Sequence, residues 1–154
     1  MALRHKVGGL ELLPDIKPLW ERLNAMNVDR SLHFGERHRN LSFEERMRPV
    51  HRKVRVGMAR VEVVLDGAGA PIGYCLATID TEYVGEVDSI YVEEGERDHG
   101  LGGDLLDSAI DWMTAFPVQR TFLSVTVGNI DAPRFYERHG FRPRNTLFEL
   151  DENQ

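Results

Sequence analysis

The sequence predicts a mixed α/β (α+β) fold, in which helices pack against a central sheet. Three observations support this fold class. Residues 54–92 are rich in β-branched and aromatic side chains and are divided by two short turns, which is typical of a meander of hairpins. Residues 93–150 alternate helical and extended patterns, which indicates strand–helix–strand crossovers. The length of 154 residues suits one hydrophobic core, so we expect residues 1–154 to form a single domain.

Two helices are expected in the N-terminal third. The first spans Pro18–Asn27, because proline suits a first helical turn and the apolar residues share one face. The second runs from Ser42 to about Lys53. Ser42 is a good N-cap residue, and Glu45 three positions later completes a capping-box pattern.

The elements of the remaining chain follow from alternation, glycine and proline. Strands are expected at residues 54–65, 72–79, 84–92 and 120–127. A helix follows the glycine-rich loop and ends near Phe116, before Pro117. A short helix over Asp131–Arg138 stops at Gly140, and residues 141–150 close the chain as a strand or hairpin.

The composition narrows the class of protein. The net charge of −6 argues against general nucleic-acid binding. A helix needs about 20 apolar residues to cross a bilayer, and no apolar run approaches this length. The N-terminus lacks the apolar core of a secretory signal. Cys75 is the only cysteine and is expected to be a buried, unreactive side chain, so no intrachain disulfide can form. We therefore expect a cytoplasmic protein that binds neither nucleic acid nor membrane.

Positive charge is concentrated in one part of the chain. Residues 28–55 hold eight Lys/Arg and four Asp/Glu, a net charge of +4, and the rest of the chain carries −10. One interpretation is a solvated, salt-bridged helix face. The other is a wall that faces an anionic ligand.

The stretch "RDHGLGGDLLDSAI" places three glycines at the start of an amphipathic helix. A helix N-terminus carries unpaired backbone N–H groups and a partial positive charge. Glycines at 100, 102 and 103 would let an anion touch this backbone, and Arg97 would add a cation. The pattern is neither Walker A nor the dinucleotide motif, whose third glycine would fall at Leu105. The alternative is a glycine-rich turn that permits tight strand–helix packing.

A second motif strengthens the first. "RDHGLGG" fits Arg/Gln-x-x-Gly-x-Gly/Ala between a strand, "EVDSIYV", and a helix, and it is followed further on by "VTVGNIDAPRFYERHGFRP". Together these motifs resemble the GNAT superfamily of acyl-CoA-dependent N-acetyltransferases, over about residues 54–150. The resemblance implies a mostly antiparallel sheet with one splayed pair of parallel strands and helices on both faces. It also implies that residues 54–150 form the cofactor-binding core and that residues 1–53 form the variable, acceptor-side helices.

The resemblance implies a site for acetyl-CoA. The pyrophosphate would be held by the loop from Arg97 to Gly103, which comprises Arg97, Asp98, His99, Gly100, Leu101, Gly102 and Gly103. The end of the preceding strand, Ile90, Tyr91 and Val92, would pair with the pantetheine arm. Asn129 would hydrogen-bond the pantetheine, and Tyr136 would lie near the thioester sulfur. No metal is implied, and the histidines show no metal-ligand spacing.

The implied chemistry is acyl transfer to an amine. Tyr136 is the natural proton donor to the leaving thiolate, and Glu86 or Asp88 could take the proton of the amine. Glu86 and Asp88 are two apart on one strand and so face the same side, with Glu86 slightly favoured. Each role has an alternative. Tyr136 could be a packed aromatic, the two carboxylates could be solvated or ion-paired, and Asn129 could simply begin a turn.

We therefore expect an N-acetyltransferase that moves an acetyl group from acetyl-CoA to a primary amine of a small molecule or protein. Transfer would be direct, within a ternary complex. The alternative is a CoA-binding regulatory or interaction module without turnover, because Asp98 and His99 depart from the usual loop residues. A nucleotide-phosphate binder is a more remote option. The expected partners are acetyl-CoA and an amine acceptor, with a homodimer as an open possibility.

Overall fold

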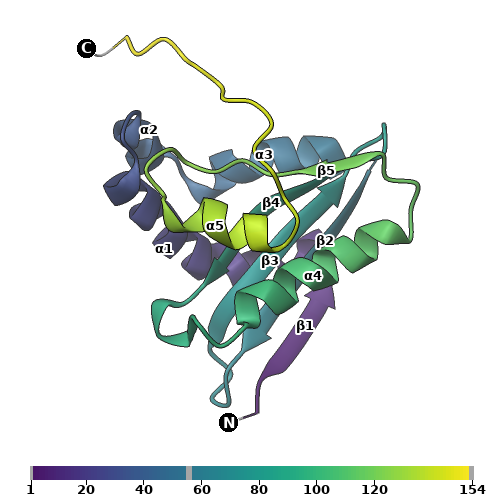
Figure 1. Ribbon diagram of the computed structural model, residues 1–154. Helices are drawn as coiled ribbons and strands as arrows, with labels where there is room; N and C mark the ends of the chain where they lie inside the picture. The colour runs from purple at the N-terminus through teal and green to yellow at the C-terminus, as the bar shows by residue number, and fades with distance from the viewer. Residues whose placement is uncertain (1, 55–56, 153–154) are drawn as a thin grey trace.

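The sheet of the computed structural model, which describes residues 2–54 and 57–152, has five strands in the order β1-β2-β3-β4-β5 (Figure 1). The strands are β1 (Arg4–Gly8), β2 (Met58–Leu65), β3 (Pro71–Ile79), β4 (Val84–Val92) and β5 (Arg120–Phe122). Strands β1 to β4 are antiparallel neighbours, and β4 and β5 are parallel. The expected mixed fold with a mostly antiparallel sheet and one parallel pair is confirmed.

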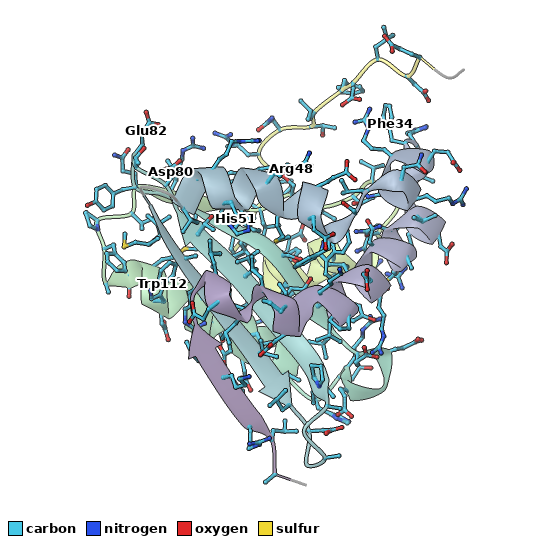
Figure 2. The ribbon with its side chains drawn as sticks, turned by 180° about the vertical axis from the view of Figure 1, so that it is seen from behind. Phe34, Arg48, His51, Asp80, Glu82 and Trp112 are labelled. Atoms are coloured by element: carbon cyan, nitrogen blue, oxygen red, sulfur yellow. The ribbon has the colours of Figure 1, made fainter. Side chains whose placement is uncertain are left out.

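Helices cover both faces of this sheet, as expected (Figures 1 and 2). The helices are α1 (Leu13–Arg30), α2 (Gly35–Asn40), α3 (Phe43–Val54), α4 (Leu101–Thr114) and α5 (Asp131–Arg138), with single 3₁₀ turns at Leu10–Leu12 and Glu94–Glu96. α1 and α3 bury their apolar sides on one face, and α4 and α5 pack on the other. The two halves of the chain thus build opposite layers.

β3 lies between these layers and is buried along almost its whole length. Its alternate side chains divide between the two cores. Tyr74 and Leu76 join the core under α1 and α3, whereas Cys75 and Ala77 join the core under α4. Period-two alternation explains why a strand covered on both sides is apolar along most of its length.

The capping box of α3 forms as expected. The Glu45 N–H donates to Ser42 Oγ at 3.1 Å, and the Ser42 N–H donates to Glu45 Oε1 at 3.2 Å. Both bonds satisfy backbone donors that the helix leaves unpaired. They fix the start of the helix that carries Arg46 and Lys53.

The N-terminal third differs from the sequence-based expectation. α1 begins at Leu13 with Pro14 in its first turn, so Pro18 lies inside the helix and does not start it. Strand β1 and helix α2 were not expected. The strand expected from residue 54 is also corrected, because Val54 ends α3 and β2 begins at Met58. Of the three residues between them, Arg55 and Val56 lie outside the described part.

The C-terminal region is less regular than expected. β5 has three residues where residues 120–127 were expected to be extended, and residues 141–150 form no strand or hairpin. The tail runs away from the body of the molecule (yellow in Figure 1) and exposes Leu147, Phe148 and Leu150. Alternation alone does not make a strand, because its N–H and C=O groups also need a neighbouring strand. None of the described helices has the length and apolarity required to cross a membrane.

Candidate active site

The candidate site lies where β4 and β5 separate. The parallel pairing joins Val84–Glu86 to Arg120–Phe122 and then stops. Beyond that point residues 87–92 and residues 124–126 line a cleft of about 1220 Å³. Most small-molecule sites have volumes of about 300–1,000 Å³. The cleft is larger, so it has room for a long cosubstrate and an acceptor.

A β-bulge lies in β4 beside this cleft. Leu76 of β3 pairs with Ser89, and Ala77 pairs with Val87, so Asp88 is the extra residue. The Asp88 carbonyl accepts a hydrogen bond from Arg46 Nη2 of α3 at 2.8 Å. Bulges redirect the side chains around them. Here the bulge lies at the edge of the cleft and is held by a cation from the opposite layer.

The loop between β4 and α4 has the backbone geometry of an anion site. Gly100 precedes α4 with a φ of 80°, and a β-carbon there would meet nothing within 4 Å. The Leu101 side chain is buried in the core, so only its backbone is available. The first N–H groups of α4, a helix of 14 residues, have no partner in their own helix. These groups can hold a phosphate that approaches over Gly100.

The other two glycines of the loop serve helix packing as well. A β-carbon at Gly103 would lie 3.0 Å from the His139 ring, and one at Gly102 would lie 3.5 Å from Phe135. Both neighbours belong to α5 or its C-terminal cap, so α5 sits closely on the first turn of α4. Gly102 and Gly103 also line the cleft, which leaves the expected phosphate role and the packing role compatible.

The remaining loop residues are placed differently from one another. Arg97 folds back on β4, where its Nε donates to the Val92 carbonyl at 2.9 Å and its guanidinium lies 5.3 Å from the Tyr91 ring centroid. Asp98 adopts a left-handed φ of 68° and lines the cleft. His99 is exposed and does not line the cleft in the described structure. Ile90, Tyr91 and Val92 all line it.

The two carboxylates of β4 share one ammonium group. Lys53 Nζ of α3 lies 2.7 Å from Glu86 Oε1 and 2.9 Å from Asp88 Oδ2. Thr78 donates to Asp88 Oδ1 at 2.6 Å. The Asp88 side chain is 3% exposed and that of Glu86 is 21% exposed, so Glu86 is the more accessible carboxylate. The ion-paired alternative that the sequence left open is present, and both side chains face the same side.

This cluster has shifted proton affinities. Burial, followed by repulsion from Glu86, raises the pKa of Asp88. Burial works against the charged form of Lys53, but its hydrogen bond to Glu86 and its attraction to Asp88 outweigh that effect and raise its pKa. Lys53 is therefore a cation at neutral pH.

Tyr136 of α5 lies on the opposite side of the sheet from this cluster and lines the cleft. It packs against Phe135 and Phe141, with ring centroids 5.2 and 6.0 Å away. Within the described structure its hydroxyl has no hydrogen-bond partner. Burial raises the pKa of Tyr136 to about 12, so the phenol keeps its proton at neutral pH.

Asn129 lies two positions before α5, which begins at Asp131, and its N–H donates to the Thr126 carbonyl at 3.1 Å, so the turn that one of its two interpretations suggested is present. Its Oδ1 accepts from the Ala132 N–H at 3.3 Å and from Arg30 Nη1 at 3.2 Å. The side chain lines the cleft, and its Nδ2 has no partner among the described residues. A turn residue whose Oδ1 accepts two hydrogen bonds and whose Nδ2 is a free donor is therefore present.

The sequence offered residues 28–55, which include Arg46, as one wall of an anion site, but it did not single out the α1 residues or His38 as lining the cleft. Trp20, Asn24 and Asn27 of α1 line it, together with His38 and Arg46. The Asn24 Nδ2 donates to the His38 carbonyl at 2.6 Å, and burial, followed by the charge of Arg37, lowers the pKa of His38. The only available signal was the helical spacing of the α1 residues, which is equally typical of a core face.

Cys75 lies outside this site. It is buried in the core, and burial raises the pKa of its thiol to about 12. Among the described residues no three His, Cys, Asp or Glu side chains gather as a metal site.

Comparison with known proteins places this chain in a family. The acetyltransferase (GNAT) family profile matches residues 23–141. No relative was found among curated proteins. A GNAT-family acetyltransferase from Staphylococcus aureus Mu50 superposes with a TM-score of 0.73 at 14% identity, over 98% of this chain and 95% of that one.

Two further structures share the fold at low identity. A ribosomal-protein-alanine N-acetyltransferase from Brucella melitensis biovar Abortus 2308 has a TM-score of 0.63 at 16% identity, over 97% and 99% of the two chains. The aminoglycoside N-acetyltransferase AAC(6')-Iy, solved with CoA, has a TM-score of 0.68 at 14% identity, over 99% and 96%. The match over residues 23–141, together with the parting parallel strands, shows that this chain belongs to the GNAT acetyltransferase family.

Proposed function

We propose that this protein is an N-acetyltransferase that transfers an acetyl group from acetyl-CoA to a primary amine. The observation that carries the proposal is the cleft between β4 and β5, which continues to the open N-terminus of α4. The unpaired edge of residues 87–92 suits main-chain pairing with a pantetheine amide. The helix N-terminus beyond Gly100 suits the pyrophosphate. The related fold of AAC(6')-Iy, solved with CoA, supports the same placement.

The acceptor amine must lose a proton before it attacks, because alkylammonium groups have pKa values of about 10 and are protonated at neutral pH. We assign this step to Glu86, directly or through a water molecule, because its carboxylate is more exposed than that of Asp88. The ion pair with Lys53 holds the Glu86 carboxylate in place beside the cleft. Asp88, held by Lys53 and Thr78, would position the cluster and take no proton itself.

In the transfer step a bond forms between the amine nitrogen and the acetyl carbon, and the bond from that carbon to sulfur breaks. The carbonyl oxygen gains negative charge, which a main-chain N–H near the end of β4 would stabilise. The leaving sulfur takes a proton from the Tyr136 hydroxyl, which is protonated and free to donate, and the resulting phenolate takes up the proton that the nitrogen loses as the amide forms. The only cysteine is buried, which favours direct transfer over an acylated thiol on the enzyme.

Tyr136→Phe tests this assignment. We expect kcat to fall by about a hundredfold or more, with the Kd for acetyl-CoA unchanged. Tyr83→Phe is the matched control, because Tyr83 is an exposed tyrosine in the turn before β4. Thiol release with a panel of amines measures kcat, and calorimetry measures Kd. An unchanged kcat in Tyr136→Phe would reject the proton-donor role.

A second candidate function is a CoA-binding module without turnover. Asp98 favours it, because a carboxylate that lines the cleft beside the phosphate loop opposes an anionic ligand. The same two measurements separate the candidates. Binding of acetyl-CoA without thiol release on any amine would support the module, and turnover with any amine would exclude it.

A further inference from the structure

We infer that the amine acceptor carries an anionic group, a carboxylate or a phosphate, which binds the guanidinium of Arg46. The inference rests on the proposed function, because it assigns the substrate class of the same cleft. Its basis is where the structure places the positively charged side chains of residues 28–54 and what each of them contacts.

Most of these cations are already neutralised or point elsewhere. Arg37 pairs with Glu149, Arg39 pairs with Glu36, and Lys53 pairs with Glu86 and Asp88. Arg30 lines the cleft but has Asn129 Oδ1 at 3.2 Å and Asp131 at 3.8 Å. These side chains therefore form the salt-bridged face that the sequence left as one interpretation.

Arg48 and Arg52 are exposed on α3, away from the cleft. Figure 2 shows Arg48 on the outer surface of this helix, together with His51. Arg55 lies outside the described residues. Of the described Lys and Arg side chains in this segment, Arg46 is the one that lines the cleft without a carboxylate partner.

Arg46 is only partly exposed, and among the described residues its guanidinium donates one hydrogen bond, through Nη2 to the neutral carbonyl of Asp88. A guanidinium has five N–H donors and favours bidentate contact with a carboxylate or phosphate. A partly buried cation with spare donors and no counter-ion is a site for an anion.

The surroundings of Arg46 add a second requirement. The Asp88 carbonyl binds Arg46, while the Asp88 side chain belongs to the Lys53 cluster, where two carboxylates face one ammonium. The cationic group, Arg46, and the acidic cluster thus both contact the same residue, Asp88. A short molecule with an ammonium and an anion, such as a free amino acid, matches both.

The other cations that line the cleft without a carboxylate partner in the described structure lie elsewhere. Arg97 is in the phosphate loop, and Arg134 and Arg138 are on α5 beside the N-terminus of α4. Their positions suit the phosphates of CoA. Arg46, on the opposite layer, remains for the acceptor.

Matched pairs of acceptors test the inference. Leucine is compared with leucinamide, and O-phosphoethanolamine with ethanolamine, by kcat/KM for thiol release from acetyl-CoA. We expect the wild-type enzyme to prefer the anionic member of at least one pair by about tenfold or more, and the preferred pair tells carboxylate from phosphate.

Two substitutions at Arg46 separate charge from structure. Arg46→Gln keeps a donor for the Asp88 carbonyl but removes the charge, so the preference should disappear while the Kd for acetyl-CoA stays the same. Arg46→Lys should keep part of the preference, and Arg48→Gln should keep all of it. Loss of preference in Arg48→Gln to the same degree as in Arg46→Gln would overturn the assignment.

The two levels of failure are distinguishable. If the neutral amines are acetylated as well as the anionic ones, the inference is wrong and the proposed function stands. If no amine in the panel is acetylated although acetyl-CoA binds, both are wrong.

Discussion

Lys53→Met removes the ammonium that Glu86 and Asp88 share. The resulting loss in the free energy of unfolding depends on how deeply these side chains are buried. Asp88 is 3% exposed and would keep only its hydrogen bond from Thr78. Breaking a buried ion pair on one side costs about 3–5 kcal/mol. Lys53 and Glu86 are each 21% exposed, so water would compensate in part. We expect a loss in the free energy of unfolding of about 2–3 kcal/mol at pH 7, or a Tm lower by about 4–12 °C.

This loss should depend on pH, with a definite sign. Burial already raises the pKa of Asp88 in the native protein, and removal of Lys53 would raise it further. A carboxyl group whose pKa is raised by folding stabilises the native state below its unfolded pKa, and this contribution is lost as pH rises through the folded pKa. The difference between variant and wild type should therefore be large at pH 7 and shrink toward pH 4.5.

Urea unfolding at several pH values measures this difference. Lys17→Met is the matched control, because Lys17 also pairs with a glutamate, Glu44, but both side chains are exposed. The control should cost about 0–1 kcal/mol. A Lys53→Met variant that loses no more stability than Lys17→Met, or whose loss does not shrink on acidification, would refute the reasoning.

Three further predictions concern the scaffold of the site. Gly128→Ala should lower the free energy of unfolding by about 1–3 kcal/mol or more, since Gly128 has a φ of 115° and a β-carbon there would lie 1.8 Å from the Arg30 carbonyl oxygen; an unchanged urea midpoint would contradict this. Ser42→Ala should cost about 1 kcal/mol in the same assay through loss of the capping box, and a neutral effect would deny the cap any energetic role. Cys75 should resist a thiol reagent in the native protein and react after unfolding, and fast native labelling would contradict its burial.

The core of the fold follows from local patterns. β4 (Val84–Val92) and α5 (Asp131–Arg138) have the bounds expected from the sequence, because turn residues and Gly140 frame them. β1 could not be predicted, since four of its five residues are exposed and show no alternation. It is a strand only because β2 lies beside it. The expected start of α1 at Pro18 was wrong, because Pro14 is the proline that lies in the first turn of the helix.

Part of the candidate site could be placed where the signal is local. The glycine loop lies at the start of α4 as its pattern predicts, and Tyr136, named from a motif, lines the cleft, while their roles stay predictions. Lys53 could not be assigned to Glu86 and Asp88, because they are 33 and 35 residues apart and only the packing of α3 on the sheet brings them together. The same packing places Arg46, and not Arg48, in the cleft. The strand or hairpin expected at residues 141–150 does not form. Its sequence pattern is strand-like, but no neighbouring strand of the described structure pairs with it.

Hydrogen exchange with and without acetyl-CoA tests most directly whether the parting of β4 and β5 is a cosubstrate site. Backbone pairing with the pantetheine and the pyrophosphate predicts that amides in residues 87–92 and 97–103 exchange more slowly when acetyl-CoA is present. β1, on the far edge of the sheet, should be unaffected. Saturating acetyl-CoA that leaves both segments unchanged, or that protects another part of the molecule, would contradict the account.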